Sequence, residues 1–397
     1  MRNIRVFLVL GIAALGIYQA ALTGLAGSGM LGERLAPYSA SAAVFAASNA
    51  LSAGKSAEAE RFATLSLAQS PLTVEAISAL ALVREQQKRG GDTLALMDLA
   101  ATGGWWDART QVWVAMHAAD DGNYDVAAQR ADALLRQGKY QDRLFPLLRA
   151  MATEPEGAKA LVARLEENPK WREPFLRDVS GLDPSRFADH EHILTGLAAS
   201  PSPPTPKETA AFVERLVRAR QYGRALAIWT VAGKRASRYV QDGDFTEVFA
   251  RKPTDAVVPF AWSIEDGAGA RAEIDVPPQP VSGPALHVTT DAGAVGVLAR
   301  QMLGLKPGRY RLSVAARVEQ GEPLMDLRWS IRCAEPGFPS PHAGVPLEAG
   351  GRQWRRMSIL LDAQTGCNAQ ILELRALGQS SSRNEIWYDL LTLRPSS

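Results

Sequence analysis

The chain has 397 residues, of which 46% are hydrophobic and 22% charged, a composition typical of folded globular domains and a length too great for one compact core. Its 44 basic and 42 acidic side chains leave a formal net charge of +2, and no long run of one sign occurs, which argues against nucleic acid as a partner. We therefore expect two or three domains.

The N-terminus predicts a membrane anchor over residues 1–32. Arg2 and Arg5 precede a stretch from Val6 to Gly32 that contains no charged side chain, long enough as a helix to span the ~30 Å hydrocarbon layer of a bilayer. Because basic residues flank its N-terminal side, we expect that end in the cytoplasm and the rest of the chain on the outer side of the membrane. The alternative is a signal peptide cleaved after Ala26, which also exports the remainder.

Residues 35–198 carry small apolar side chains at helical spacing, and the pattern repeats. Gly54 and Ala59 are restated by Gly122 and Ala127, two periods of about 34 residues further on. This period resembles the tetratricopeptide repeat, a two-helix unit, and the resemblance implies an α-solenoid. One helical hairpin cannot bury its apolar face alone, but stacked copies can. We expect such a solenoid to bind other proteins by its surface shape.

Trp105 and Trp106 are candidates for a protein-binding patch on the inner face of this solenoid. The alternative is that one of them, together with Trp113, fills gaps between helices, as large aromatic side chains commonly do. His190 and His192 are the only histidines close together in the sequence, but side chains two residues apart share a face only on a strand. We therefore expect a solvated loop at this point and not a metal site.

Residues 199–206 are rich in proline, which lacks a backbone donor and disfavours helical geometry in the residue before it. We predict a stiff linker there. Helical spacing resumes after it, and residues 207–240 are expected to form a terminal helical hairpin broken near Gln221.

From residue 242 to residue 397 the pattern changes to short strands. Tyr310, Leu312 and Val314 alternate with arginine and serine, and residues 326–333 alternate in the same way, so each strand has one apolar face. Many short amphipathic strands predict a two-layer antiparallel β-sandwich. The fold class expected for the whole chain is multidomain α + β.

Both cysteines, Cys333 and Cys367, lie in this strand-rich half, each near the end of a predicted strand. In an exported chain they predict a disulfide bond, because disulfides persist in oxidising compartments. The alternative is a pair of free, buried thiols, since free cysteine is common in protein cores.

Four segments of this half resemble the landmarks of galactose-binding-like jelly rolls, the group that includes carbohydrate-binding modules. They are Asp242–Phe245, Pro259–Trp262, Leu305–Tyr310 and Ile386–Asp389. The resemblance implies a jelly roll over residues 242–397 with a glycan as its ligand.

The same resemblance makes Asp244 and Asp389 candidate ligands of a structural calcium ion, since carboxylate oxygens suit a hard cation. In this chain Thr246 follows Phe245 and the glutamate comes one position later, at Glu247. This departure from the family pattern argues against calcium, so no cofactor is expected.

The candidate glycan-binding residues lie on the polar faces of two predicted strands. Guanidinium groups bind carboxylates and hydroxyls with fixed geometry, which makes arginine suitable for sugar recognition. The alternative is an ordinary solvent-exposed face of a sandwich. The candidates are Arg311, Arg317, Asp326, Arg328 and Arg332.

The sequence contains no Gly-x-Ser-x-Gly, His-Glu-x-x-His, phosphate-binding glycine loop or Cys-x-x-Cys, so we expect no enzyme activity. The two resemblances imply a scaffold anchored in the inner membrane of a Gram-negative bacterium, with the bulk of the chain in the periplasm. We expect it to bind partner proteins of an envelope polysaccharide machinery and polysaccharide itself. A protein-only assembly factor and a glycan-active enzyme without a recognisable motif are the alternatives.

Overall fold

The computed structural model describes residues 36–88, 90–232, 239–252, 258–321, 326–338 and 352–396. The predicted anchor, residues 1–32, lies outside these ranges, and within them no helix has the length and apolar character needed to cross a membrane. The chain divides into two compact units with the boundary between Arg164 and Leu165. The predicted divisions at residues 199–206 and 242 remain predictions.

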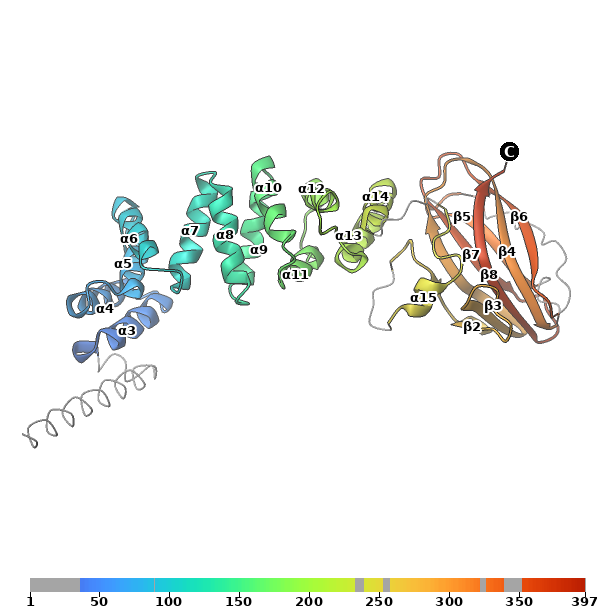
Figure 1. Ribbon diagram of the computed structural model, residues 1–397, viewed down its shortest axis with the longest axis horizontal. Coiled ribbons are helices and arrows are strands. Elements are labelled where there is room, and N and C mark those ends of the chain that lie inside the picture. Colours follow the sequence, from blue (N-terminus) through green and yellow to red (C-terminus); the bar gives the residue numbers. More distant parts are fainter. Residues whose placement is uncertain are drawn as a thin grey trace, which may run out of the picture. The chain divides into compact units, whose positions relative to one another are not determined.

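The first unit consists of successive helices that pack on their neighbours (Figure 1). Ser39 and Asp107 cap two of them, and their side chains accept hydrogen bonds from the backbone of the first turn. As the repeat pattern predicts, Ala59 and Ala127 are fully buried, which allows close approach of neighbouring helices. The helices are α3 (Ala40–Ser52), α4 (Ser56–Gln69), α5 (Val74–Gln86), α6 (Gly90–Thr102), α7 (Ala108–Asp120), α8 (Tyr124–Leu135), α9 (Gln141–Met151) and α10 (Pro155–Leu165).

The second unit begins with further helices and ends with strands. Its helices are α11 (Arg172–Arg177), α12 (Phe187–Ala198), α13 (Pro206–Arg218), α14 (Tyr222–Ala232) and the short α15 (Thr246–Ala250). The loop predicted around His190 and His192 was wrong, because both lie in α12. His190 is 2% exposed and packs edge-on against the ring of Phe212, at 4.6 Å between ring centroids. Burial of the apolar face stabilises α12, which ends at Ala198, before the first proline of the proline-rich segment.

The proline-rich segment 199–206 is not helical before Pro206, as predicted, but it is not a free spacer. Arg172 of α11 holds it: Nη1 donates hydrogen bonds to the carbonyl and hydroxyl oxygens of Ser202, at 3.1 and 2.7 Å, and Nη2 donates to the carbonyl of Pro203 at 3.1 Å. The guanidinium also pairs with Glu208 of α13. The segment is therefore held by hydrogen bonds from α11, which also pairs with α13.

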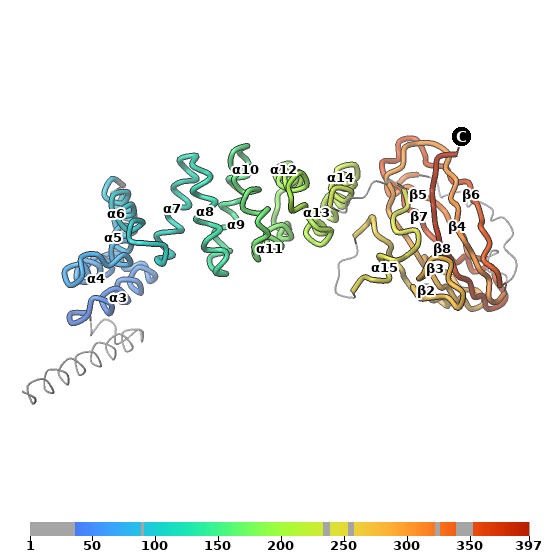
Figure 2. The backbone as a smooth tube through the Cα atoms, in the orientation of Figure 1, coloured from blue at the N-terminus to red at the C-terminus, as the bar shows by residue number. Residues whose placement is uncertain are grey.

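The strands form an antiparallel β-sandwich whose course can be followed in Figures 1 and 2. They are β1 (Ser263–Ile264), β2 (Ala268–Asp275), β3 (Ala285–Leu303), β4 (Gly308–Gln320), β5 (Leu327–Cys333), β6 (Arg355–Ala363), β7 (Gln370–Leu377) and β8 (Asn384–Pro395). The first part of the long β3 pairs with β8, β8 pairs with β4, and β4 pairs with β6. The last part of β3 pairs with β7, and β7 pairs with β5. β3 therefore joins both layers.

The core between the layers is built on aromatic side chains. The ring of Trp329 contacts the rings of Trp262 and Tyr388, at 5.9 and 5.7 Å between ring centroids. All three side chains are almost completely buried. Trp387 is buried outside this core and stacks on His287 at 4.0 Å. Adjacent residues on a strand point to opposite faces, so Tyr388 and Trp387 cannot share one.

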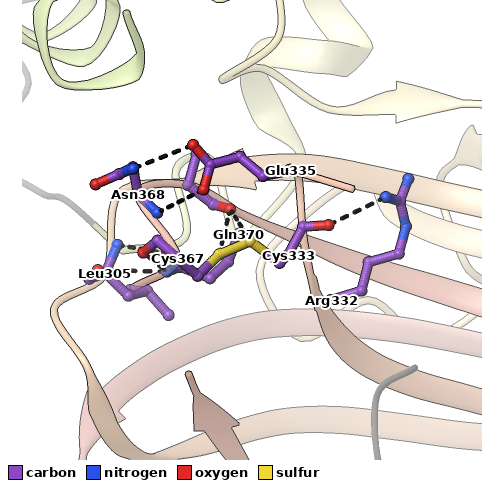
Figure 3. The surroundings of a disulfide bond; sticks show 8 residues. Leu305, Arg332, Cys333, Glu335, Cys367, Asn368 and Gln370 are labelled. Carbon is purple, nitrogen blue, oxygen red and sulfur yellow. Dashed lines mark hydrogen bonds between the residues drawn. A yellow bond between two sulfur atoms is a disulfide. The ribbon is translucent and has the colours of Figure 1, made fainter. Parts of the chain in front are cut away.

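The predicted disulfide is confirmed: Cys333, the last residue of β5, is bonded to Cys367, which lies just before β7 (Figure 3). Around it, Asn368 donates from Nδ2 to Oε1 of Glu335 at 3.1 Å, and Arg332 donates from Nη1 to the carbonyl of Cys333 at 3.4 Å. The bond therefore ties together the ends of two paired strands.

Candidate functional site

The candidate site is the outer face of the layer formed by β5, β7 and the last part of β3. The inward side chains of β5 and β7, such as Trp329 opposite Leu374, belong to the core, so the alternate side chains face outward. We call these outward residues the arginine face: Arg328, Ser330 and Arg332 on β5, Ile371, Glu373 and Arg375 on β7, and Val297, Arg300 and Met302 on β3.

Glu373 lies at the centre of the arginine face. Its side chain is 2% exposed, and its two oxygens are shared between two cations: Nε of Arg332 donates to Oε2 at 3.1 Å and Nε of Arg375 donates to Oε1 at 3.2 Å. Ser330 is its register partner on β5. A buried carboxylate is stable when charged partners and hydrogen bonds satisfy it, and here one carboxylate orients two guanidinium groups.

Arg328 has a different environment. It lies directly opposite Arg375 in the register of β5 and β7, and like charges at such positions are destabilising. Its Nε is buried and has no hydrogen-bond partner. By contrast, the neighbouring Arg300 is exposed and paired with Glu265 at 2.6 Å. The arginine face therefore contains one guanidinium group whose charge no described carboxylate offsets.

Asp326 was expected beside these arginines, but it is completely buried. Its Oδ1 accepts a hydrogen bond from the backbone N–H of Gln379 at 2.7 Å, which links the residue before β5 to the turn after β7. We assign Asp326 a structural role, because a side chain without exposed area cannot contact a glycan on the face.

Arg311 and Arg317 were expected beside Arg328 and Arg332, and this was wrong. They lie on β4, which pairs with β6 and β8 in the other layer. Arg317 is 6% exposed and bound to Glu319 and to Oε1 of Gln279, whereas Arg311 is exposed. Alternation along two strands shows which side chains share a face of each strand, but β5 pairs with β7 and not with its sequence neighbour β4.

Asp244 and Asp389 do lie near each other. Burial raises the pKa of Asp389, and the negative charge of Asp244 raises it further. However, Oδ2 of Asp389 accepts a hydrogen bond from Ser282 Oγ at 2.8 Å and Oδ1 accepts one from the N–H of Leu390 at 2.6 Å. Because both oxygens are already satisfied within the chain, this pair is a poor fit for calcium.

Among the described residues, one group of side chains is close enough to suggest a metal site: Cys333, Glu335 and Cys367. Two of its three members form the disulfide, and a disulfide sulfur is not the thiolate that binds metals. This group therefore offers no metal centre.

Trp105 and Trp106 lie between α6 and α7 of the first unit, with 45% and 65% of their area exposed. The guanidinium of Arg130 stacks over the ring of Trp105 at 3.7 Å. The same unit contains a hollow of about 670 Å³, and its lining includes Trp113 and Met116 of α7 and Tyr140 before α9. Trp113 is partly buried and stacks on His117 at 4.7 Å between ring centroids, so both interpretations of these tryptophans remain open.

Our sequence reasoning missed Glu373, Arg375 and Arg300. The signal was present, since Glu373 and Arg375 alternate with Leu372, Leu374 and Ala376 as on any half-buried strand. What the alternation could not provide was the pairing of this strand with β5, which places the charged side chains of the two strands together.

No protein-family model matches the chain, and no curated protein matches it. Among solved structures, the chain is similar to a CBM4 module (16% identity, 40% of this chain and 99% of that chain, TM-score 0.28). It is also similar to a CBM22-1 xylan-binding domain from Paenibacillus barcinonensis (13%, 37% and 90%, TM-score 0.26) and to a CBM61 module in complex with β-1,4-galactotriose (12%, 41% and 100%, TM-score 0.26). These likenesses cover at most 41% of the chain, so we infer its function from its own residues.

Proposed function

We propose that this protein is a non-catalytic scaffold that binds glycan through the arginine face and another protein through its first helical unit. Residues 1–32 would anchor it in the inner membrane with the remainder in the periplasm, where it would serve the synthesis or export of an envelope polysaccharide. The observation that carries the glycan-binding part is the arrangement of Arg332 and Arg375 on the single carboxylate of Glu373, with Arg328 opposite Arg375.

The arrangement supports binding for a physical reason. Glu373 fixes Arg332 and Arg375 through their Nε atoms. Because Nη1 of Arg332 donates to the carbonyl of Cys333, the pre-oriented donors left for a ligand are Nη2 of Arg332 and the terminal nitrogens of Arg375. Guanidinium groups held in this way lose little conformational entropy when a ligand oxygen arrives. The apolar side chains of Ile371 and Met302, register partners beside Arg332, can contact the C–H face of a sugar ring.

The protein-binding part is supported by the first unit alone. Trp105 and Trp106 are exposed, and large exposed aromatic side chains are enriched where proteins contact one another. The hollow in the same unit offers charged and apolar groups together. A membrane-anchored protein with two weak binding surfaces gains from the high effective concentration of its partners.

Binding of the full chain to an array of bacterial polysaccharides tests the glycan part. Arg375→Ala removes one pre-oriented donor while Arg332 still pairs with Glu373. A charge-assisted hydrogen bond is worth ~1.5–3 kcal/mol, so we expect about a tenfold or greater loss of affinity. The control is Arg394→Ala, an exposed arginine on β8 of the other layer, which should bind unchanged. Equal binding by both variants would contradict the assignment of the face.

The second candidate is a protein-only assembly factor with a structural sandwich. It is favoured by one observation: no aromatic side chain lies among the residues of the arginine face, although aromatic rings commonly stack on sugars. If the folded chain binds no polysaccharide on the array, the protein-only function replaces the proposed one.

A further inference from the structure

We propose that the ligand of the arginine face is an acidic glycan and that the carboxylate of a uronic acid residue occupies the position between Arg328 and Arg375. This inference rests on the proposed function, and it narrows the ligand from glycans in general to one chemical class.

The first argument is the charge of the face. Arg300 has its own carboxylate, Glu265. Arg332 and Arg375 share the one carboxylate of Glu373, and no described carboxylate pairs with Arg328. Within the described residues no other acidic side chain pairs with these three. The centre of the face therefore carries two positive charges in excess of its negative charge, which an anionic ligand offsets and a neutral sugar does not.

The second argument is the position of the excess charge. Arg328 and Arg375 are direct register partners on antiparallel strands, where opposed Cβ atoms are ~4.5–5.5 Å apart. The guanidinium groups carried at these two opposed positions repel each other. A ligand carboxylate that lies between them offsets this repulsion.

The third argument separates a glycan carboxylate from other ligands. Neutral glycans rely on aromatic platforms, and the face has none. Small inorganic anions make no use of apolar surface, yet Val297 lies opposite Arg375 and Met302 opposite Ile371 on the next strand. A sugar acid presents a carboxylate and an apolar ring face together, and its planar carboxylate matches the parallel N–H groups of guanidinium.

The experiment measures affinity of the full chain, in detergent, for oligogalacturonate and alginate oligosaccharides. The comparison ligands are the same oligosaccharides after reduction of their carboxyl groups to alcohols. We expect binding of an acidic form that is at least tenfold tighter than that of its reduced form and that weakens as salt is added, because exposed charges are screened.

The variant is Arg328→Gln, and the matched control is Arg311→Gln, which faces Arg394 across β4 and β8 in the other layer. Arg328→Gln should lower affinity for the acidic ligand at least tenfold and Arg311→Gln less than twofold. Because Arg328→Gln removes one of two opposed like charges, its melting temperature should equal or exceed that of the parent, which separates loss of binding from unfolding.

Two outcomes overturn the inference. If the reduced oligosaccharides bind as tightly as the acidic ones, and Arg375→Ala still weakens them, the glycan-binding function stands and the acidic ligand does not. If the folded chain binds neither form, both the inference and the proposed function fail.

Discussion

Asp242 lies before the first strand of the sandwich and forms hydrogen bonds with α15 and with Trp262. It adopts a left-handed backbone conformation with φ of 50°, its carbonyl accepts a hydrogen bond from Nε1 of Trp262 at 2.9 Å, and its carboxylate accepts two from the N–H groups of Glu247 and Val248, both at 2.8 Å. Burial nevertheless raises the pKa of Asp242 to about 6, and the charges of Glu247 and Asp244 add to the effect. The folded state therefore favours the protonated carboxyl.

This shift predicts a pH dependence of stability. The folded-state pKa lies above the ordinary value of 3.8. The stabilisation of the folded state by protonated Asp242 is therefore fully present below pH 3.8 and is lost as pH rises through about 6. Asn tolerates the left-handed conformation and does not titrate. We expect the free energy of unfolding of Asp242→Asn, measured with denaturant relative to the parent, to rise by about 1 kcal/mol between pH 4 and pH 6.5. This value allows for solvent screening of the charge. A difference that is constant with pH would contradict this.

At the scale of elements, the proline-rich segment owes its position to a buried ion pair. The side chains of Arg172 and Glu208 are 2% and 7% exposed and pair at 2.8 Å. Glu208 also accepts a hydrogen bond from the N–H of Thr205 at 2.7 Å, as part of a capping box at the start of α13. One pair therefore fixes α11, the proline-rich segment and α13 together.

Arg172→Met should lower the free energy of unfolding by about 3–5 kcal/mol, because it leaves Glu208 charged and buried without its partner. Arg177→Ala, which breaks an exposed pair with Glu173, is the control and should cost less than about 1 kcal/mol. Replacing both residues of the buried pair, as Arg172→Met with Glu208→Leu, should recover part of the loss. Urea denaturation measures all three, and equal losses for Arg172→Met and Arg177→Ala would exclude a stabilising buried pair.

Much of the element order could be predicted from the sequence, because periodicity reports burial directly. The buried alanines at 59 and 127, the faces of β4 and β5, and the disulfide were all accessible in this way. The helix around His190 was missed, because its burial depends on contact with Phe212 more than 20 positions later. The site was half predicted: Arg328 and Arg332 were named, but their partners across β7 depend on strand pairing.

At the scale of the whole molecule, the two compact units suit different ligands. The helical unit presents exposed tryptophans and a hollow with charged and apolar lining, which suits a protein segment. The sandwich presents pre-oriented guanidinium groups on a rigid layer, which suits an extended acidic polymer with repeated carboxylates. A chain that holds both ligands keeps a polymer close to the protein that acts on it.

The most direct test of the central claim is hydrogen–deuterium exchange of the full chain with and without a bound acidic oligosaccharide. We predict slower exchange in peptides covering β5 and β7, residues 327–333 and 370–377, and no change in β4 and β6, residues 308–320 and 355–363, of the other layer. Protection confined to β4 and β6, or to the first helical unit, would contradict the assignment of the arginine face as the glycan-binding site.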